Sequence, residues 1–223
     1  EGGAEEVIAQ AIANRRESVF LVSKVYPHNA SKQKAIAACE RSLKRLKTDY
    51  LDVYLLHWRG SVPLAETLEA FETLQQSGKI RSYGVSNFDI EDMQEVSQLK
   101  GGKGIVTNQV LYNLMRRGIE WNLLPWCRQQ NIPIMAYSPI EQGRLLNNKT
   151  IKAIAQQRGV TAAQVAIAWL LHQEDIIVIP KSSRIDHVEQ NYAAKDLKLS
   201  AEELAALDVA FPPPTKPVSL EML

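Results

Sequence analysis

The sequence is poor in cysteine and in long apolar runs. Its two cysteines, Cys39 and Cys127, have neither the spacing of zinc ligands nor the density of a disulfide framework, which fits a reducing compartment. The longest apolar stretches, such as 176–179, are far shorter than the ~20 residues that span a bilayer, and residues 1–20 carry no secretory signal pattern. We therefore expect a soluble, cytoplasmic protein without a membrane partner or a metal centre.

An excess of charge of either sign is also absent. The 26 Lys and Arg residues against 25 Asp and Glu residues leave a formal net charge of +1. Such a balance provides no global field for nucleic acid or an anionic membrane surface, so we expect neither as a partner. Any bound anion must be held by local cations. The rest of the composition, with 45% hydrophobic and 23% charged residues, is typical of a globular protein.

What the sequence does contain is an alternation of short apolar runs with helix-like stretches. Six runs are predicted to be strands: 19–22, 51–56, 80–85, 105–110, 132–136 and 176–179. Ser31 is expected to begin a helix that ends near Leu46, and Ser77-Gly78 to close the next one. Capping boxes are predicted for Thr161 with Gln164 and for Ser200 with Glu203. The long interval between the last two strands predicts two helices instead of one.

Strands that are apolar on both faces, each followed by a helix, indicate a parallel sheet, either open or closed into a barrel. No Gly-x-Gly-x-x-Gly segment follows a strand, and the glycines of 101–104 precede one, which disfavours the open nucleotide-binding sheet. A barrel of eight strand-helix units needs about 250 residues. Since the chain begins inside a helix predicted over 4–14, we expect a single (β/α)8 TIM barrel domain over residues 1–223. About the last six units would be present and the N-terminal strands would be lacking.

Polar side chains follow every predicted strand. The strand ends carry, in order, Ser23-Lys24, His57-Trp58, Ser86-Asn87, Asn108-Gln109, Tyr137-Ser138 and Pro180-Lys181-Ser182. Each alone has a structural explanation, such as a solvated lysine, a turn former or a buried core histidine. Because ligands of parallel α/β proteins bind beyond the carboxyl ends of the strands, the repetition at all six ends favours a site.

These segments resemble the aldo-keto reductase family. The resemblance rests on Phe20-Leu21-Val22-Ser23-Lys24, Asp52-Val53-Tyr54-Leu55-Leu56-His57-Trp58, Gly84-Val85-Ser86-Asn87-Phe88 and Ile179-Pro180-Lys181-Ser182, and extends from about residue 1 to Phe211. It implies an eight-stranded barrel that uses NADPH (NADP+) to reduce small aldehydes or ketones to alcohols. By position, Lys24 resembles the family's lysine and His57 its histidine. The family's tyrosine acid and aspartate would lie a few residues before Glu1.

The resemblance also implies the cofactor contacts. Ser86, Asn87 and Gln109 match the residues that hold the nicotinamide carboxamide, and Tyr137 matches the ring that stacks on the nicotinamide. The loop over the pyrophosphate would include Ser138, Ile140 and Gln142. Lys181, Ser182 and Ser183 match the pocket for the adenosine 2′-phosphate, and Gln190 and Asn191 match the pair that contacts adenine.

One position departs from the family pattern. His187 stands where many members have an arginine that stacks on adenine and pairs with the 2′-phosphate. A histidine can stack, but it is largely neutral at pH 7 and makes no bidentate contact. Arg184 is the candidate to compensate, and we expect a weaker preference for NADPH over NADH than in members with the arginine.

The sequence says less about the substrate pocket than about the cofactor contacts. Tyr26 and Trp58 resemble the aromatic wall around the carbonyl, and the short tail after Phe211 predicts small substrates and broad specificity. We expect a monomer. Two alternatives stay open: a regulatory or redox-sensing NADPH-binding subunit on the same fold, and an inactive fragment that lacks the tyrosine.

Overall fold

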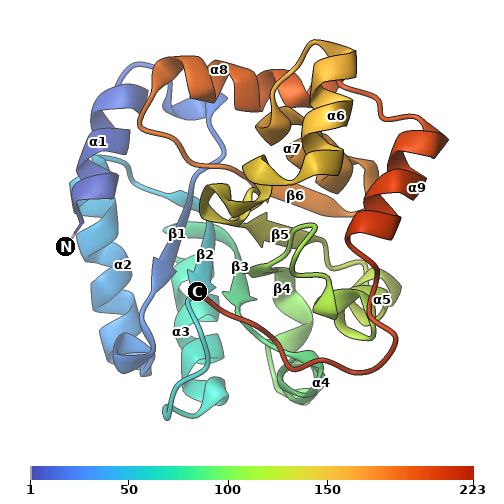
Figure 1. The fold of residues 1–223 in the computed structure, drawn as a ribbon. Coiled ribbons are helices and arrows are strands. Elements are labelled where there is room, and N and C mark those ends of the chain that lie inside the picture. Colours follow the sequence, from blue (N-terminus) through green and yellow to red (C-terminus); the bar gives the residue numbers. More distant parts are fainter. Residues whose placement is uncertain (1) are drawn as a thin grey trace. The chain divides into compact units, whose positions relative to one another are not determined.

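The structure, a computed structural model, describes residues 2–223 (Figure 1). Its contacts cluster into two compact units, one ending at Asn108 and the other running from Gln109 to Leu223. The prediction of one domain over residues 1–223 stays a prediction. The strands are ordered β1-β2-β3-β4-β5-β6 in the sheet, which is their order in the sequence. Within residues 2–223, no helix has both the length and the apolarity needed to cross a membrane.

The first unit alternates helices and strands. Its elements are α1 (Gly3–Ile12), β1 (Val22–Val25), α2 (Lys32–Leu46), β2 (Leu51–Leu56), α3 (Leu64–Gln76), β3 (Ile80–Ser86) and α4 (Ile90–Gln98), followed by the start of β4 (Ile105–Leu111). β1 pairs with β2 and β2 with β3, both in parallel. All of β2 is buried, as expected for a strand covered on both faces. In Figure 1, α1 and α2 lie side by side.

Helix ends follow the local signals that the sequence contains. α2 begins after Ser31 and ends at Lys47, whose left-handed backbone (φ 53°) closes the helix, while Cys39, Leu43 and Leu46 are buried on its inner face. The capping boxes predicted at Thr161 and Ser200 are confirmed. A third box, in which the side chains of Asp89 and Asp92 cap α4 reciprocally, was missed.

The first predicted strand was misplaced by three residues. It lies at Val22–Val25 instead of 19–22, because the residues before it are held by other groups. Arg16 donates a hydrogen bond to the carbonyl of Val19 at 2.8 Å, and the Phe20 side chain is 70% exposed. As a result Lys24 lies inside β1. The fifth strand also starts later than predicted, at Ile134, because Pro133 has no N–H to donate to a neighbouring strand.

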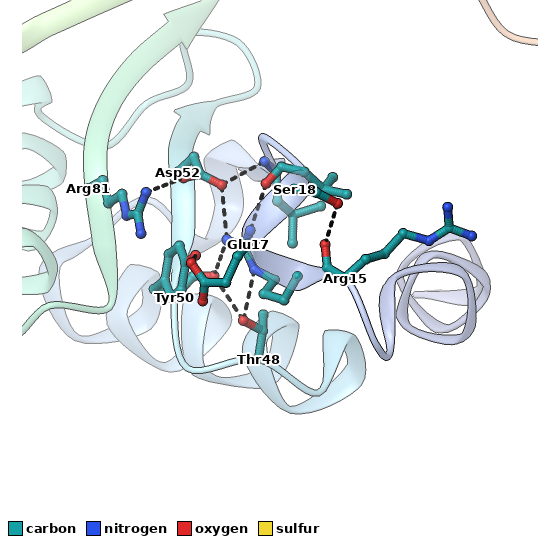
Figure 2. Close-up of polar contacts among 10 residues, drawn as sticks. Arg15, Glu17, Ser18, Thr48, Tyr50, Asp52 and Arg81 are labelled. Carbon is teal, nitrogen blue, oxygen red and sulfur yellow. Dashed lines mark hydrogen bonds and ion pairs between the residues drawn. The ribbon is translucent and has the colours of Figure 1, made fainter.

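A buried carboxylate fixes this lead-in segment to β2 and β3 (Figure 2). Asp52 accepts a hydrogen bond from the backbone N–H of Leu21 at 2.8 Å and forms ion pairs with Arg16 at 2.9 Å and Arg81 at 3.2 Å. Both guanidinium groups also lie over the ring of Tyr50, at 3.9 and 4.2 Å from its centroid. The cluster lies where β2 and β3 begin, at the opposite end of these strands from His57 and Asn87.

The second unit contains the rest of β4, then α5 (Leu123–Gln129), β5 (Ile134–Tyr137), α6 (Lys149–Arg158), α7 (Ala162–His172), β6 (Ile176–Ile179), α8 (Ile185–Ala193) and α9 (Ala201–Ala210). β5 and β6 pair in parallel. The two helices predicted between them are confirmed. α7 supplies much of the core of this unit, including the fully buried Trp169, which makes an edge-on contact with Tyr112.

Candidate active site

The carboxyl ends of β1 and β2 bring together four of the predicted residues. The register pairs Lys24 with Leu55, and the backbone N–H of His57 donates to the carbonyl of Val25 at 2.9 Å. The ring of Tyr26 lies 5.2 Å from the imidazole of His57 and 5.5 Å from the indole of Trp58. Since Tyr26 is 43% and Trp58 36% exposed, they form an aromatic wall that is open to a ligand.

The electrostatics of this corner set the protonation state of His57. Burial, and then the positive charge of Lys24, lower the pKa of His57 to about 4. Burial also lowers the pKa of Lys24 below its ordinary value. At neutral pH the imidazole is therefore uncharged, with one N–H to donate, and it lies beside a cationic side chain.

The end of β3 adds the predicted carboxamide contacts of this unit. Ser86 is buried, and Asn87 has a left-handed backbone (φ 57°), a conformation that asparagine tolerates better than most residues. The Nδ2 of Asn87 donates to the carbonyl of His57 at 3.1 Å and to the Oγ of Ser86 at 3.3 Å. The predicted catalytic and cofactor residues of the first unit are thus joined directly.

In the second unit, polar groups again follow the strands. Gln109 is buried in β4, with its Nε2 2.7 Å from the sulfur of Met135, and Tyr137 is the last residue of β5. After β5 the backbone adopts left-handed angles at Ser138 (φ 51°), Gln142 (φ 53°) and Gly143 (φ 91°). Left-handed residues at this density are costly and must be held by their surroundings. We call residues 138–144, which include Ile140, the cofactor loop.

The group that holds the cofactor loop is Glu141, which the sequence did not single out. Its side chain is fully buried, and it accepts hydrogen bonds from Asn113 at 2.8 Å, from Arg116 at 3.0 Å and from Arg144 at 3.3 Å. Burial raises the pKa of Glu141, but these hydrogen bonds and the arginine charges outweigh burial and lower it below its ordinary value. Asn113 also donates to the carbonyl of Ser138 at 2.9 Å.

The predicted phosphate residues lie between β6 and α8. Lys181 and Ser183 are exposed, and Ser182 accepts a hydrogen bond from the backbone N–H of Arg184 at 3.1 Å. Arg184 itself pairs with Asp186 at 2.6 Å, so its charge is shared with that carboxylate. The predicted adenine contacts His187, Gln190 and Asn191 recur on α8 at spacings of three and four residues, which places them on one face.

The chemistry of these groups fits the cofactor that the resemblance implies. Buried amide and hydroxyl groups match the donors and acceptors of a carboxamide, Tyr137 offers a ring for stacking, and exposed lysine and serine side chains suit a phosphate. Among the described residues, no group of three or more His, Cys, Asp or Glu side chains could hold a metal ion.

Two further contacts near the site were not anticipated. His28 stacks on Tyr26 with ring centroids 5.4 Å apart. Arg59, directly after Trp58, pairs with Asp92 at 2.8 Å and Glu95 at 2.6 Å on α4. The position of Arg59 next to Trp58 in the sequence could have marked it as a residue near the site. Its partners could not be predicted, because they lie on α4 and their position depends on the path of the chain after β3.

Comparison with known proteins identifies the family of the chain. The model of the aldo/keto reductase family matches residues 1–210. Methylglyoxal reductase YeaE of Escherichia coli is 54% identical over 100% of this chain and 80% of its own length, and glyoxal reductase of Bacillus subtilis is 37% identical over 86% and 68%. A crystal structure of an aldo/keto reductase from Klebsiella pneumoniae in complex with NADP and acetate is 53% identical, covers 100% of this chain and 80% of that one, and has a TM-score of 0.98. The α/β fold with parallel strands in sequence order agrees with the (β/α)8 barrel expected from the sequence. The chain therefore belongs to the aldo/keto reductase family.

Proposed function

We propose that the protein carrying this chain is an NADPH-dependent reductase that converts short aldehydes and ketones, 2-oxoaldehydes above all, to alcohols. The observation that carries the proposal is the corner formed by Lys24, neutral His57 and the aromatic wall of Tyr26 and Trp58. When bound, NADPH supplies the hydride.

His57 would orient the substrate. A neutral imidazole with a free N–H donates to a carbonyl oxygen, which polarises the carbonyl and fixes its direction. The low pKa of His57 keeps it in this form over the whole physiological range. Holding the reacting carbon in a productive position is itself a large contribution to the rate.

Lys24 would assist the proton donor. As the carbonyl oxygen takes up charge, it must be protonated, and the resemblance assigns this step to a tyrosine. A phenol has a pKa near 10, so it needs a nearby cation to exchange its proton readily at neutral pH. The burial of Lys24 strengthens its field on such a neighbour, because charge is screened less in a dry site.

The remaining predicted residues would bind NADPH. Ser86, Asn87 and Gln109 would hold the carboxamide, Tyr137 would stack on the nicotinamide, and the cofactor loop would cover the pyrophosphate. Lys181, Ser182 and Ser183 would receive the 2′-phosphate, with His187, Gln190 and Asn191 at adenine. Support comes from the NADP and NADPH complexes of the Klebsiella pneumoniae relative, which is 53% identical.

The relatives narrow the substrate. A methylglyoxal reductase that is 54% identical and a glyoxal reductase that is 37% identical act, by their names, on short dicarbonyl compounds. An exposed wall of two aromatic rings suits small, flat carbonyl compounds of this kind. We propose methylglyoxal as the first substrate to test.

The test is the loss of NADPH absorbance on adding methylglyoxal to the purified protein, on a sample whose intact mass has been recorded. Turnover at a kcat/KM of about 10⁴ M⁻¹s⁻¹ or more would support the reductase. NADPH binding without turnover of any short aldehyde would favour the regulatory subunit instead. Rapid turnover by a polypeptide of 25.0 kDa would show that the assignment of the acid to a residue before Glu1 is wrong.

A further inference from the structure

Arg116 bridges two carboxylates in the second unit. Its Nε and Nη2 both donate to the same oxygen of the buried Glu141, at 3.0 Å each, while its Nη1 pairs with Glu221. Glu141 belongs to the cofactor loop. Glu221 belongs to the segment 212–223, which follows α9 and which we call the C-terminal strap.

The neighbouring Arg117 holds the residue directly before the strap. Its Nη1 donates to the carbonyl of Phe211 and to Asp208, both at 2.6 Å, and its Nε donates to Glu120 at 2.8 Å. Its guanidinium also lies 5.0 Å from the ring of Trp169. Because Arg117 is only 10% exposed and donates four hydrogen bonds, the residue from which the strap departs is firmly fixed.

Between these two anchors the strap lies against residues 114–118. A Cβ at position 118 would lie 3.2 Å from the side chain of Val218, so a larger residue there would push Val218 by a few tenths of an ångström. Gly118 and Val218 line a cavity of about 420 Å³, together with Leu114, Met115 and Phe211. Beyond Glu221, the backbone of Leu223 lies close enough to the phenol of Tyr137 to lower its pKa, although burial raises that pKa overall. The strap therefore approaches the last residue of β5 and is tied, through Arg116, to the loop that follows it.

We propose that Arg116 is a positioning residue that couples the order of the C-terminal strap to that of the cofactor loop. This inference rests on the proposed function: if the cofactor loop binds NADPH, the coupling through Arg116 makes NADPH binding order the strap as well.

The physical basis is the fixed geometry of one guanidinium between two anions. Glu141 cannot move away, because it is buried and also bonded to Asn113, so the plane of Arg116 is set by the loop. Any change that straightens or loosens the loop rotates this plane and lengthens the contact with Glu221. The end of the strap in turn lies near the hydroxyl of Tyr137, whose ring is proposed to stack on the nicotinamide.

Hydrogen exchange followed by mass spectrometry tests the coupling. Without cofactor, Arg116→Gln should speed exchange about fivefold or more in both the strap and the cofactor loop. Glu221→Gln should do so mainly in the strap, with a smaller effect on the loop, because Arg116 keeps its bonds to Glu141. Arg158→Gln breaks an arginine pair of the same kind, to Glu203, away from the strap, and should change neither segment. Gly118→Ala crowds Val218 by a few tenths of an ångström and leaves the charges intact, so it should speed exchange mainly in the strap, as Glu221→Gln does.

With NADPH added, the protein should show slower exchange in the loop and in the strap, and Glu221→Gln should retain only the loop response. Two results would overturn the coupling. One is faster exchange in only the strap or only the cofactor loop of Arg116→Gln, and the other is a strap in Glu221→Gln that NADPH still slows as much as in the parent. If NADPH fails to bind the parent protein, the proposed function fails, and the exchange measured without cofactor still decides on Arg116.

Discussion

The side-chain amide of Asn87 donates a hydrogen bond to the main-chain carbonyl of His57 at 3.1 Å, and so joins the polar ends of β2 and β3. A residue proposed to hold the carboxamide thereby also fixes the backbone of a residue proposed to orient the substrate. The left-handed φ of 57° at Asn87 is what directs its side chain back toward β2.

Replacing Asn87 by aspartate should therefore impair both functions. The variant keeps the size of the side chain and tolerates the left-handed backbone, but it places a carboxylate oxygen against the carbonyl of His57. We expect kcat/KM to fall about tenfold or more, with weaker NADPH binding in a fluorescence titration. Asn131→Asp, at an exposed left-handed position after α5, is the matched control and should behave like the parent. Equal losses in both variants would show that backbone strain, and not the contact with His57, is responsible.

His57 should make the protein more sensitive to acid. Its pKa is about 4 in the fold against 6.5 for the unperturbed group, so the unfolded chain binds a proton that the folded chain refuses between these values. Stability must then fall as the pH drops from 6.5 toward 4. In urea unfolding at a series of pH values, the midpoint of His57→Gln should fall less than that of the parent. Parallel curves for the two proteins would contradict the lowered pKa.

Asp52→Asn should reduce stability without affecting the site. The substitution removes the charge that pairs with Arg16 and Arg81 in a position that is only 4% exposed, so we expect a loss of about 3 kcal/mol in the free energy of unfolding. Glu69→Gln breaks the exposed pair with Lys32 and should cost no more than about 0.5 kcal/mol. Activity of Asp52→Asn at low temperature should match the parent, and a selective loss of activity would show that the cluster does more than hold the strands.

Lys181→Ala should weaken NADPH binding about tenfold and leave NADH binding unchanged, because only NADPH carries the 2′-phosphate. His187→Arg should strengthen NADPH binding, since Arg184 is already paired with Asp186. Dissociation constants for both cofactors, measured on the parent and both variants, check this. If the parent and Lys181→Ala each bind NADPH and NADH with equal dissociation constants, Lys181 does not contribute to a 2′-phosphate pocket.

Much of the fold could be predicted because each strand is a local signal. The run 51–56 is apolar on both faces and becomes the fully buried β2 with the predicted bounds. β1 could not be placed as well, because Val19 and Leu21 are strand-like residues whose backbone groups are taken by the side chains of Arg16 and Asp52. The sequence does not reveal which side chains bind these backbone groups. The sequence therefore predicts which strands are buried, but it does not predict which backbone groups bind side chains instead of a neighbouring strand.

The site divides in the same way. His57 and Asn87 directly follow strands and Lys24 lies near the end of β1, so topology alone places them at one end of the sheet. Glu141 lies in a loop, and its importance comes from a side chain that is buried among Asn113 and Arg116, more than twenty residues earlier in the chain. A buried carboxylate in a loop has the same sequence signature as an exposed one, so only the structure could identify it.

The central claim is that Lys24 serves the chemical step and not cofactor binding. In the protein that carries this chain, Lys24→Met keeps a similar volume and removes the charge. We predict that it reduces methylglyoxal turnover by about a thousandfold or more, while NADPH still quenches tryptophan fluorescence with a dissociation constant close to that of the parent. Full turnover in this variant, or loss of turnover only in proportion to lost NADPH binding, would contradict the account.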